Sequence, residues 1–197
     1  GSRPSAFSLT SPGPLRLYST RELLKLPPPT WLIAPILPAG GLVGLYGPPE
    51  HGKSFLAIDM ALCVATGLPW QGHTVHPGLV LYVSAEGGTG IAKRVDAWLQ
   101  THDVLPVDAR VAWLTEALPV SAGSDDMETL LSRIEDEVEE HPTLVVLDTL
   151  ARCFVNEGDE NLQKDMGRFI RGVDWLRREF GATVMIVHHT RLDGTRE

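Results

Sequence analysis

Residues 47–54 read GPPEHGKS, in which a lysine and a serine close a glycine-containing run. This spacing matches the pattern G-x-x-x-x-G-K-[ST], whose loop wraps around phosphate oxygens with its backbone N–H groups pointing inward. Glycine at both ends permits that backbone path, the lysine ammonium places a charge on the β and γ phosphates, and the serine hydroxyl can ligate Mg²⁺. We therefore predict that Lys53 binds nucleotide phosphates and that Ser54 binds magnesium.

The surroundings of this run are those that a phosphate loop needs. An apolar strand is predicted directly before it, at 42–46, and an apolar helix directly after it, at 55–66, so that the positive helix N-terminus faces the phosphates. A dinucleotide-binding site would need G-x-G-x-x-G at this turn, and that pattern is absent. ATP is favoured over GTP because no guanine-reading motif follows the later strands. The predicted nucleotide contacts are Gly47, Pro48, Pro49, Glu50, His51, Gly52, Lys53, Ser54 and Phe55.

Two acidic side chains follow apolar segments that we predict to be buried strands. Asp148 closes LVVLD, and Glu86 follows LVLYVSA and precedes a glycine-rich stretch. Ligands of an open parallel sheet bind beyond the carboxyl ends of its strands, so both acids would emerge beside the phosphate loop. We predict that Asp148 supports Mg²⁺ and that Glu86 is the catalytic base that polarises the attacking water. A solvated acid at a strand end is the alternative for Glu86.

A pair of histidines, His188 and His189, ends the last predicted strand. Successive side chains of a strand face opposite sides, so only one imidazole can point at the nucleotide. We favour His189, which would contact the γ-phosphate and transmit its loss to the following loop. Adjacent histidines on a strand diverge, and His73 and His76 are too few for a zinc site, so no transition-metal centre is expected.

Short apolar segments alternate with longer amphipathic ones from residue 41 onward. The predicted strands are 42–46, 79–84, 111–114, 144–148 and 183–188. Helical stripes lie between them, and the residues that mark these stripes are Ile91, Val95, Trp98 and Leu99; Met127, Leu130, Leu131, Ile134 and Val138; and Leu162, Met166, Phe169, Ile170, Val173 and Leu176. This alternation predicts an α/β fold, a mostly parallel sheet with helices on both faces.

The segment 1–38 is rich in proline and serine, and we predict an N-terminal arm or linker before a core at 39–197. Ser19 and Glu22 have the spacing of a capping box, which predicts a short helix that ends before Pro27. The arm would lie over the core or against a neighbouring subunit, and a partly ordered linker is the alternative. Gly1 and Ser2 look like a remnant of tag removal.

The formal net charge of -8 argues against a uniformly basic nucleic-acid binder, so any DNA contact must be local. No run of about 18 apolar residues is present, so no membrane span is expected. The two cysteines, Cys63 and Cys153, show no CxxC spacing, which favours a reduced, cytoplasmic location.

Taken in order, GPPEHGKS, LYVSAEG, LVVLDTLAR and VMIVHHT resemble the RecA-like P-loop ATPases, and within them the plasmid RepA-type hexameric replicative helicases. The resemblance runs from about Trp31 to the end of the chain. It implies that Lys53 and Ser54 bind ATP and Mg²⁺, and that Glu86 is the catalytic base. It also implies that Asp148 supports the metal and that the His188/His189 pair senses the γ-phosphate. The expected assembly is a homo-oligomer, a hexameric ring or a filament, with ATP sites between subunits.

The arginine finger of that family has no counterpart that can be assigned here, and we expect the chain to be truncated at its C-terminus.

Three hypotheses for function stay open. The one we prefer is a helicase motor on single-stranded DNA; the others are a RecA/RadA-like recombination or repair ATPase and a DNA-independent nucleotide-gated switch. The segments 151–162 and 190–197 would line the DNA path, although the first is acidic. The basic residues of the last helix, Arg168, Arg171, Arg177 and Arg178, are more simply explained as a solvated face.

Overall fold

The computed structural model describes residues 17–84, 88–121, 124–138, 140–154 and 163–189. Its centre is a five-stranded parallel sheet in the order β3-β7-β6-β4-β5. The strands are β3 (Leu42–Gly47), β7 (Thr183–His189), β6 (Leu144–Asp148), β4 (Val80–Ser84) and β5 (Val111–Leu114). All five predicted strands are present, each within one residue of its predicted ends, which confirms the predicted sheet.

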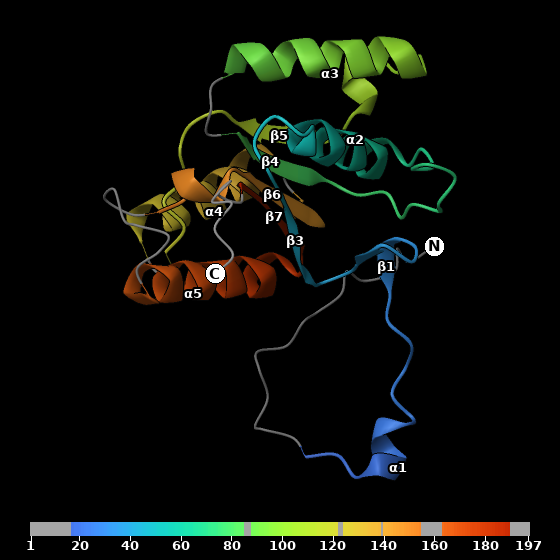
Figure 1. Ribbon diagram of the computed structural model, residues 1–197, viewed down its shortest axis with the longest axis vertical. Coiled ribbons are helices and arrows are strands. Elements are labelled where there is room, and N and C mark those ends of the chain that lie inside the picture. The colour runs from blue at the N-terminus through green and yellow to red at the C-terminus, as the bar shows by residue number, and fades with distance from the viewer. Residues whose placement is uncertain (1–16, 85–87, 122–123, 139, 155–162, 190–197) are drawn as a thin grey trace, which may run out of the picture.

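Helices cover both faces of the sheet, as predicted (Figure 1). α2 (Lys53–Thr66) and α3 (Gly88–His102) lie on one side, and α4 (Asp125–Glu137) and α5 (Gln163–Phe180) lie on the other. Alternate strand residues supply the two cores: Tyr82 and Val146 pack with α2 and α3, whereas Leu81 and Val145 pack with α4 and α5. Among the described residues, no helix is long and apolar enough to cross a bilayer.

Two helix boundaries show why these segments start and stop where they do. α2 begins at Lys53, two residues earlier than predicted, because Gly52 adopts a left-handed conformation (φ 75°) and serves as its N-cap. Gly181, with φ 66°, lets the chain leave α5 and enter β7, which confirms the predicted stop. On α5, Phe169 is buried as predicted, but Ile170 is 38% exposed because it lies at the margin of the apolar stripe.

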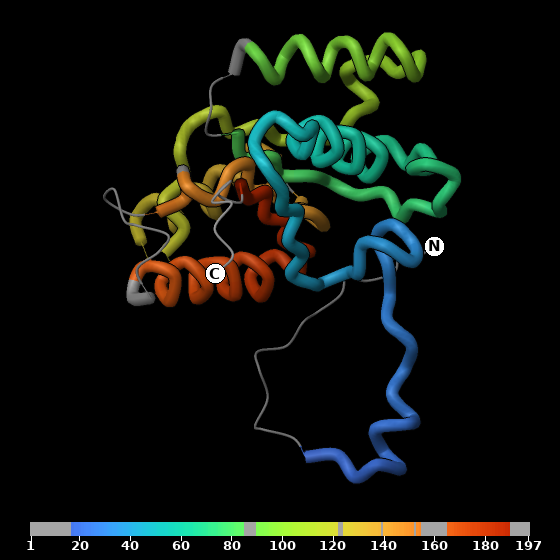
Figure 2. The backbone as a smooth tube through the Cα atoms, viewed as in Figure 1, coloured from blue at the N-terminus to red at the C-terminus, as the bar shows by residue number. Residues whose placement is uncertain are grey.

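The N-terminal part divides into a helix and a hairpin. α1 (Thr20–Leu23) has the predicted capping box at Ser19 and Glu22, buries no residue and lies away from the body of the protein (Figure 2). β1 (Trp31–Ile33) and β2 (Leu37–Pro38) then form an antiparallel hairpin whose Ile33 and Leu37 are fully buried in the α2-side core. The packed core therefore begins near Trp31, before residue 39. The prolines of this segment suggested a linker, but its apolar residues pack into the core.

Candidate nucleotide-binding site

The carboxyl ends of four neighbouring strands meet at one edge of the sheet. Gly47 of β3 pairs with His189 of β7, and Asp148 of β6 pairs with Val187 of β7 and Ser84 of β4. Since the strands are parallel, the phosphate loop, the second histidine and the strand-end aspartate share this edge. Glu86, two residues beyond Ser84, lies outside the described residues.

The loop between β3 and α2 is held in a tight turn by local conformation. Glu50 and Gly52 both have positive φ, 62° and 75°. No atom lies within 4 Å of the position that a Cβ would take on Gly52, so glycine is required there for its conformation rather than for space. His51 Nδ1 lies 2.7 Å from the carbonyl oxygen of Pro49, which ties the loop to itself.

The side chain of Lys53 folds back over this loop. It is only 7% exposed, and its Nζ donates a hydrogen bond of 2.5 Å to the carbonyl oxygen of Pro48. A Cβ on Gly47 would lie 3.8 Å from Lys53 Cδ, an ordinary van der Waals contact, so the path of the lysine side chain does not by itself require glycine there. The ammonium is therefore held at the loop by a neutral carbonyl, a partner that phosphate oxygens can replace with stronger charge-assisted hydrogen bonds.

Ser54, Asp148 and Tyr82 form a hydrogen-bonded group beside the loop. Ser54 Oγ donates to Asp148 Oδ1 at 3.2 Å, and the Tyr82 hydroxyl donates to Asp148 Oδ2 at 2.7 Å. Burial, together with the neighbouring Asp148 carboxylate, raises the pKa of Tyr82 far above its ordinary value, so this hydroxyl remains a donor. Tyr82 is not among the predicted site residues, because its one signal in the sequence is a tyrosine among the aliphatic residues of a buried strand.

The oxygen donors of this group fit a magnesium ion that arrives with a nucleotide. The described residues hold no group of three or more His, Cys, Asp or Glu side chains that could bind a metal ion by themselves. Mg²⁺ in nucleotide sites keeps several waters and is bound by one or two protein oxygens together with the phosphates. Ser54 and Asp148 supply such oxygens.

The two histidines lie on opposite faces of β7 by the alternation of the strand. Met185 and Val187 pack into the α2-side core, whereas Val184 and Ile186 pack on the other side. Continued alternation puts His189 on the side of the phosphate loop. Its Nδ1 is buried and has no hydrogen-bond partner among the described residues. Both observations support the choice of His189 as the γ-phosphate sensor, which stays a prediction.

Phe55, the last of the predicted nucleotide contacts, turns its ring towards α3. The ring is half-exposed, and the guanidinium carbon of Arg94 lies 4.5 Å from its centroid. The ring therefore has a cation–π partner on α3.

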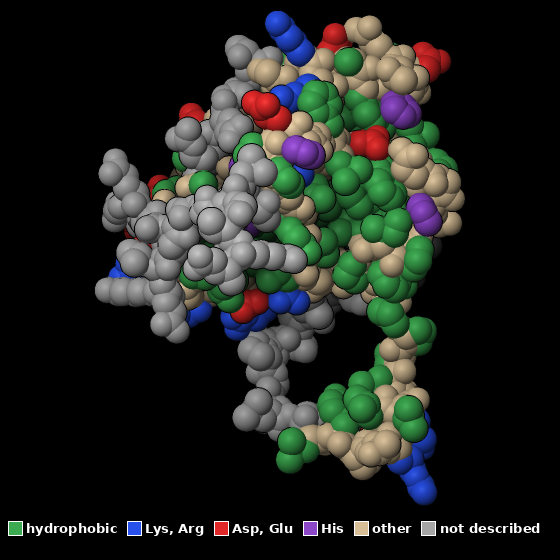
Figure 3. Space-filling view, viewed as in Figure 1, with side chains coloured by type: hydrophobic (Ala, Val, Ile, Leu, Met, Phe, Trp, Pro, Cys, Tyr) green, Lys and Arg blue, Asp and Glu red, His purple; other side chains and the backbone are tan. Residues whose placement is uncertain are grey.

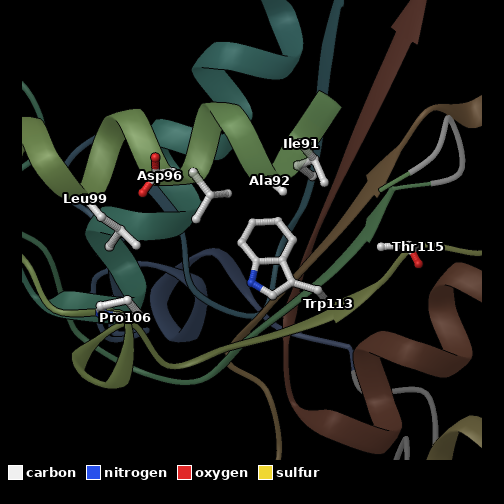
Figure 4. A pocket seen from close by; sticks show the side chains of 8 residues that line it. Ile91, Ala92, Asp96, Leu99, Pro106, Trp113 and Thr115 are labelled. Atoms are coloured by element: carbon white, nitrogen blue, oxygen red, sulfur yellow. The ribbon is translucent and has the colours of Figure 1, made fainter. Parts of the chain in front are cut away.

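A separate cavity of about 390 Å³ opens under α3, beside β5 and the short helix η1 (Pro106–Asp108) (Figure 4). Its walls are mainly apolar and include Ile91, Val95, Asp96, Leu99, Pro106 and Trp113. No residue of the phosphate loop lines it. The cavity is therefore distinct from the predicted nucleotide site, and sequence analysis gave no sign of it.

A family model described as an AAA domain matches residues 14–195. The chain belongs to the AAA domain family. Among curated proteins it is similar to the DNA repair and recombination protein RadB of Thermococcus onnurineus (strain NA1), with 23% identity over 157 residues, 79% of this chain and 63% of that protein. Among solved structures it is similar to the crystal structure of the RadB recombinase, with 22% identity, a TM-score of 0.52, and coverage of 81% of this chain and 66% of that chain.

The structural likeness shows the fold, and this chain spans somewhat less than two thirds of the RadB chains that it matches. Together, the family and the fold confirm the prediction of a RecA-like P-loop ATPase. They do not confirm the finer resemblance to RepA-type replicative helicases, because both relatives are named as recombination proteins.

Proposed function

We propose that this AAA domain binds ATP with Mg²⁺, hydrolyses it, and works as a recombination or repair ATPase on DNA. The observation that carries the proposal is the hydrogen bond from Ser54 Oγ to Asp148 Oδ1. It brings together the loop hydroxyl and the strand-end carboxylate, two groups 94 positions apart that P-loop enzymes use for magnesium. When bound with ATP, the magnesium ion would neutralise phosphate charge.

Each residue of the site has a distinct role in this proposal. The Lys53 ammonium leaves the Pro48 carbonyl and binds β and γ phosphate oxygens. Ser54 and Asp148 would hold the magnesium ion with their side-chain oxygens. Glu86 takes the proton of the attacking water, and His189 senses whether the γ-phosphate is present.

The choice of a recombination or repair ATPase over a helicase rests on the relatives. Both are RadB proteins by name, whereas the helicase hypothesis rests on motif resemblance alone. DNA contact is not expected from α5, since Arg177 donates to the carbonyl oxygen of Gly40 and to Asp174, and Arg168 pairs with Asp165. We expect it from the segments 151–162 and 190–197, of which residues 155–162 and 190–197 lie outside the described residues.

Self-association is supported by an apolar surface over β3 and α2 (Figure 3). Tyr46 of β3 is 74% exposed, and Leu42 of the same strand and Phe55 and Leu56 of α2 are also exposed. Among the described strands β3 pairs only with β7, so its other edge is open. An apolar surface next to an open strand edge is typical of a contact with another polypeptide. We propose a homo-oligomer, a filament or a ring, with this surface at or near the subunit contact.

The test of this function is steady-state ATP turnover with and without single-stranded DNA, followed by assays of strand pairing and of duplex unwinding. A recombination or repair ATPase should show turnover stimulated by single-stranded DNA, with strand pairing and without unwinding. Unwinding driven by ATP would instead favour the RepA-type helicase. Turnover that is indifferent to DNA would favour a nucleotide-gated switch.

A further inference from the structure

Tyr82 reaches Asp148 along a diagonal of the sheet. On β4 and β6, Tyr82 pairs with Val146, and Ser84 pairs with Asp148. Tyr82 and Asp148 therefore occupy the same face of the sheet, offset by two residues on neighbouring parallel strands, which puts their Cα atoms roughly 8 Å apart. A phenol is long enough to span that gap, and the observed distance from its hydroxyl to Asp148 Oδ2 is 2.7 Å.

The ring of Tyr82 is fixed by its surroundings. It is fully buried, and its direct partner on β5 is Trp113, whose ring centroid lies 5.0 Å away at an interplanar angle of 37°. Figure 4 shows the Trp113 indole under α3, in the wall of the cavity. Packing of this kind restricts the ring to one position, so the hydroxyl can donate only in the direction of Asp148.

The two carboxylate oxygens of Asp148 consequently have different partners. Oδ2 accepts from Tyr82, and Oδ1 accepts from Ser54. We propose that Tyr82 is a positioning residue for the magnesium site, whose hydroxyl fixes the carboxylate plane of Asp148 so that Oδ1 faces Ser54. Tyr82 itself touches neither nucleotide nor metal in this proposal, which rests on the proposed function. Partners that orient a metal-binding carboxylate typically change metal affinity by about 10- to 100-fold when removed.

The experiment measures Mn²⁺ binding, by electron paramagnetic resonance, in the presence of a non-hydrolysable ATP analogue. In Tyr82→Phe, which keeps the ring and removes the hydroxyl, we expect the Mn²⁺ dissociation constant to rise about 10-fold or more. Binding of the analogue in a metal chelator should stay unchanged. The matched control is Tyr18→Phe, since Tyr18 is exposed beside α1, and this variant should bind Mn²⁺ as the wild type does.

A double-mutant cycle with Asp148→Asn separates positioning from a merely structural role. If Tyr82 acts through Asp148, Tyr82→Phe should have little further effect on Mn²⁺ affinity in the Asp148→Asn background. Additive effects, or an unchanged Mn²⁺ affinity in Tyr82→Phe alone, would overturn the proposal. The proposal would also be overturned if Tyr82→Phe weakened metal-independent binding of the analogue, measured in a chelator, as much as it weakened Mn²⁺ binding. Failure of the wild type to bind the analogue at all would instead remove the proposed function, and with it this inference.

Discussion

Ser54 and Asp148 lie 94 positions apart, yet Ser54 Oγ donates a hydrogen bond of 3.2 Å to Asp148 Oδ1. The contact exists because α2 starts at the carboxyl end of β3, and β6 ends at the same edge of the sheet two strands away. A parallel sheet thus brings a helix N-terminus and a strand-end acid together.

Glu86→Gln should leave ATP affinity within about twofold of the wild type and lower turnover by about 100-fold or more, because an amide cannot accept the proton of the attacking water. Equilibrium binding and single-turnover hydrolysis measure the two effects. Glu116→Gln is the matched control, since Glu116 is exposed on the segment after β5. Hydrolysis retained in Glu86→Gln would place the base elsewhere.

His189→Ala should lower turnover on the order of 10-fold or more if the imidazole hydrogen-bonds the γ-phosphate in the transition state. His188→Ala should have the smaller effect, because alternation along β7 directs that side chain to the opposite face of the sheet. Both variants are compared at saturating ATP. The reverse order of the two effects would assign the sensor to His188.

Asp59→Ala should destabilise the fold by about 2–4 kcal/mol, since two indole N–H groups would lose their acceptor. Trp70 Nε1 donates to Asp59 Oδ2 at 2.9 Å, and Trp98 Nε1 donates to Oδ1 at 2.7 Å. Urea unfolding followed by tryptophan fluorescence measures the loss. Asp96→Ala is the control because Asp96 is exposed, and it should change the free energy of unfolding by only about 0.5 kcal/mol. An equal decrease in the free energy of unfolding in the two variants would show that the hydrogen bonds from the indoles to Asp59 do not stabilise the fold.

The free energy of unfolding should fall as the pH rises above about 9. Burial raises the pKa of the Cys63 thiol to about 12, and burial also raises the pKa of the Cys153 thiol to about 12. Between about pH 9 and pH 12, both thiols therefore stay protonated in the folded chain, whereas in the unfolded chain, where the thiol pKa is lower, they ionise. The contribution of the two thiols to the free energy of unfolding is fully present below about pH 9, and it is lost as the pH rises towards the thiol pKa of the folded chain.

Denaturant titrations between pH 7 and 10.5 check this dependence, with the double variant Cys63→Ala and Cys153→Ala as the control. Removal of the thiols should make the decline with pH shallower. Parallel pH profiles for the wild type and the double variant would show that the thiols do not cause it.

The sheet and the phosphate loop could be predicted because their signals are local. An apolar strand followed by GPPEHGKS needs no knowledge of the rest of the chain, and periodicity locates the buried strands and helical stripes. Asp148 and His189 could be placed at the same edge because parallel strands end together.

The remaining features depend on packing between distant segments. The hairpin around Ile33 carries prolines, so its composition suggests a linker although its apolar residues fill a core. The sequence alone indicates only that Tyr82 is a buried strand residue, and the sheet register then brings its hydroxyl to Asp148. The hydrogen bonds from Trp70 and Trp98 to Asp59 likewise join three segments, and no local sequence pattern predicts that these segments pack together.

The central claim, that Lys53 and its loop bind ATP for hydrolysis, is tested most directly by magnesium-dependent ATP hydrolysis of the wild type beside Lys53→Ala and Lys93→Ala. Lys93 is exposed on α3 and controls for the loss of one positive charge. Turnover should be present in the wild type and in Lys93→Ala, and it should disappear in Lys53→Ala and on removal of magnesium. Equal turnover in Lys53→Ala and the wild type would contradict the assignment of this loop as the ATP site.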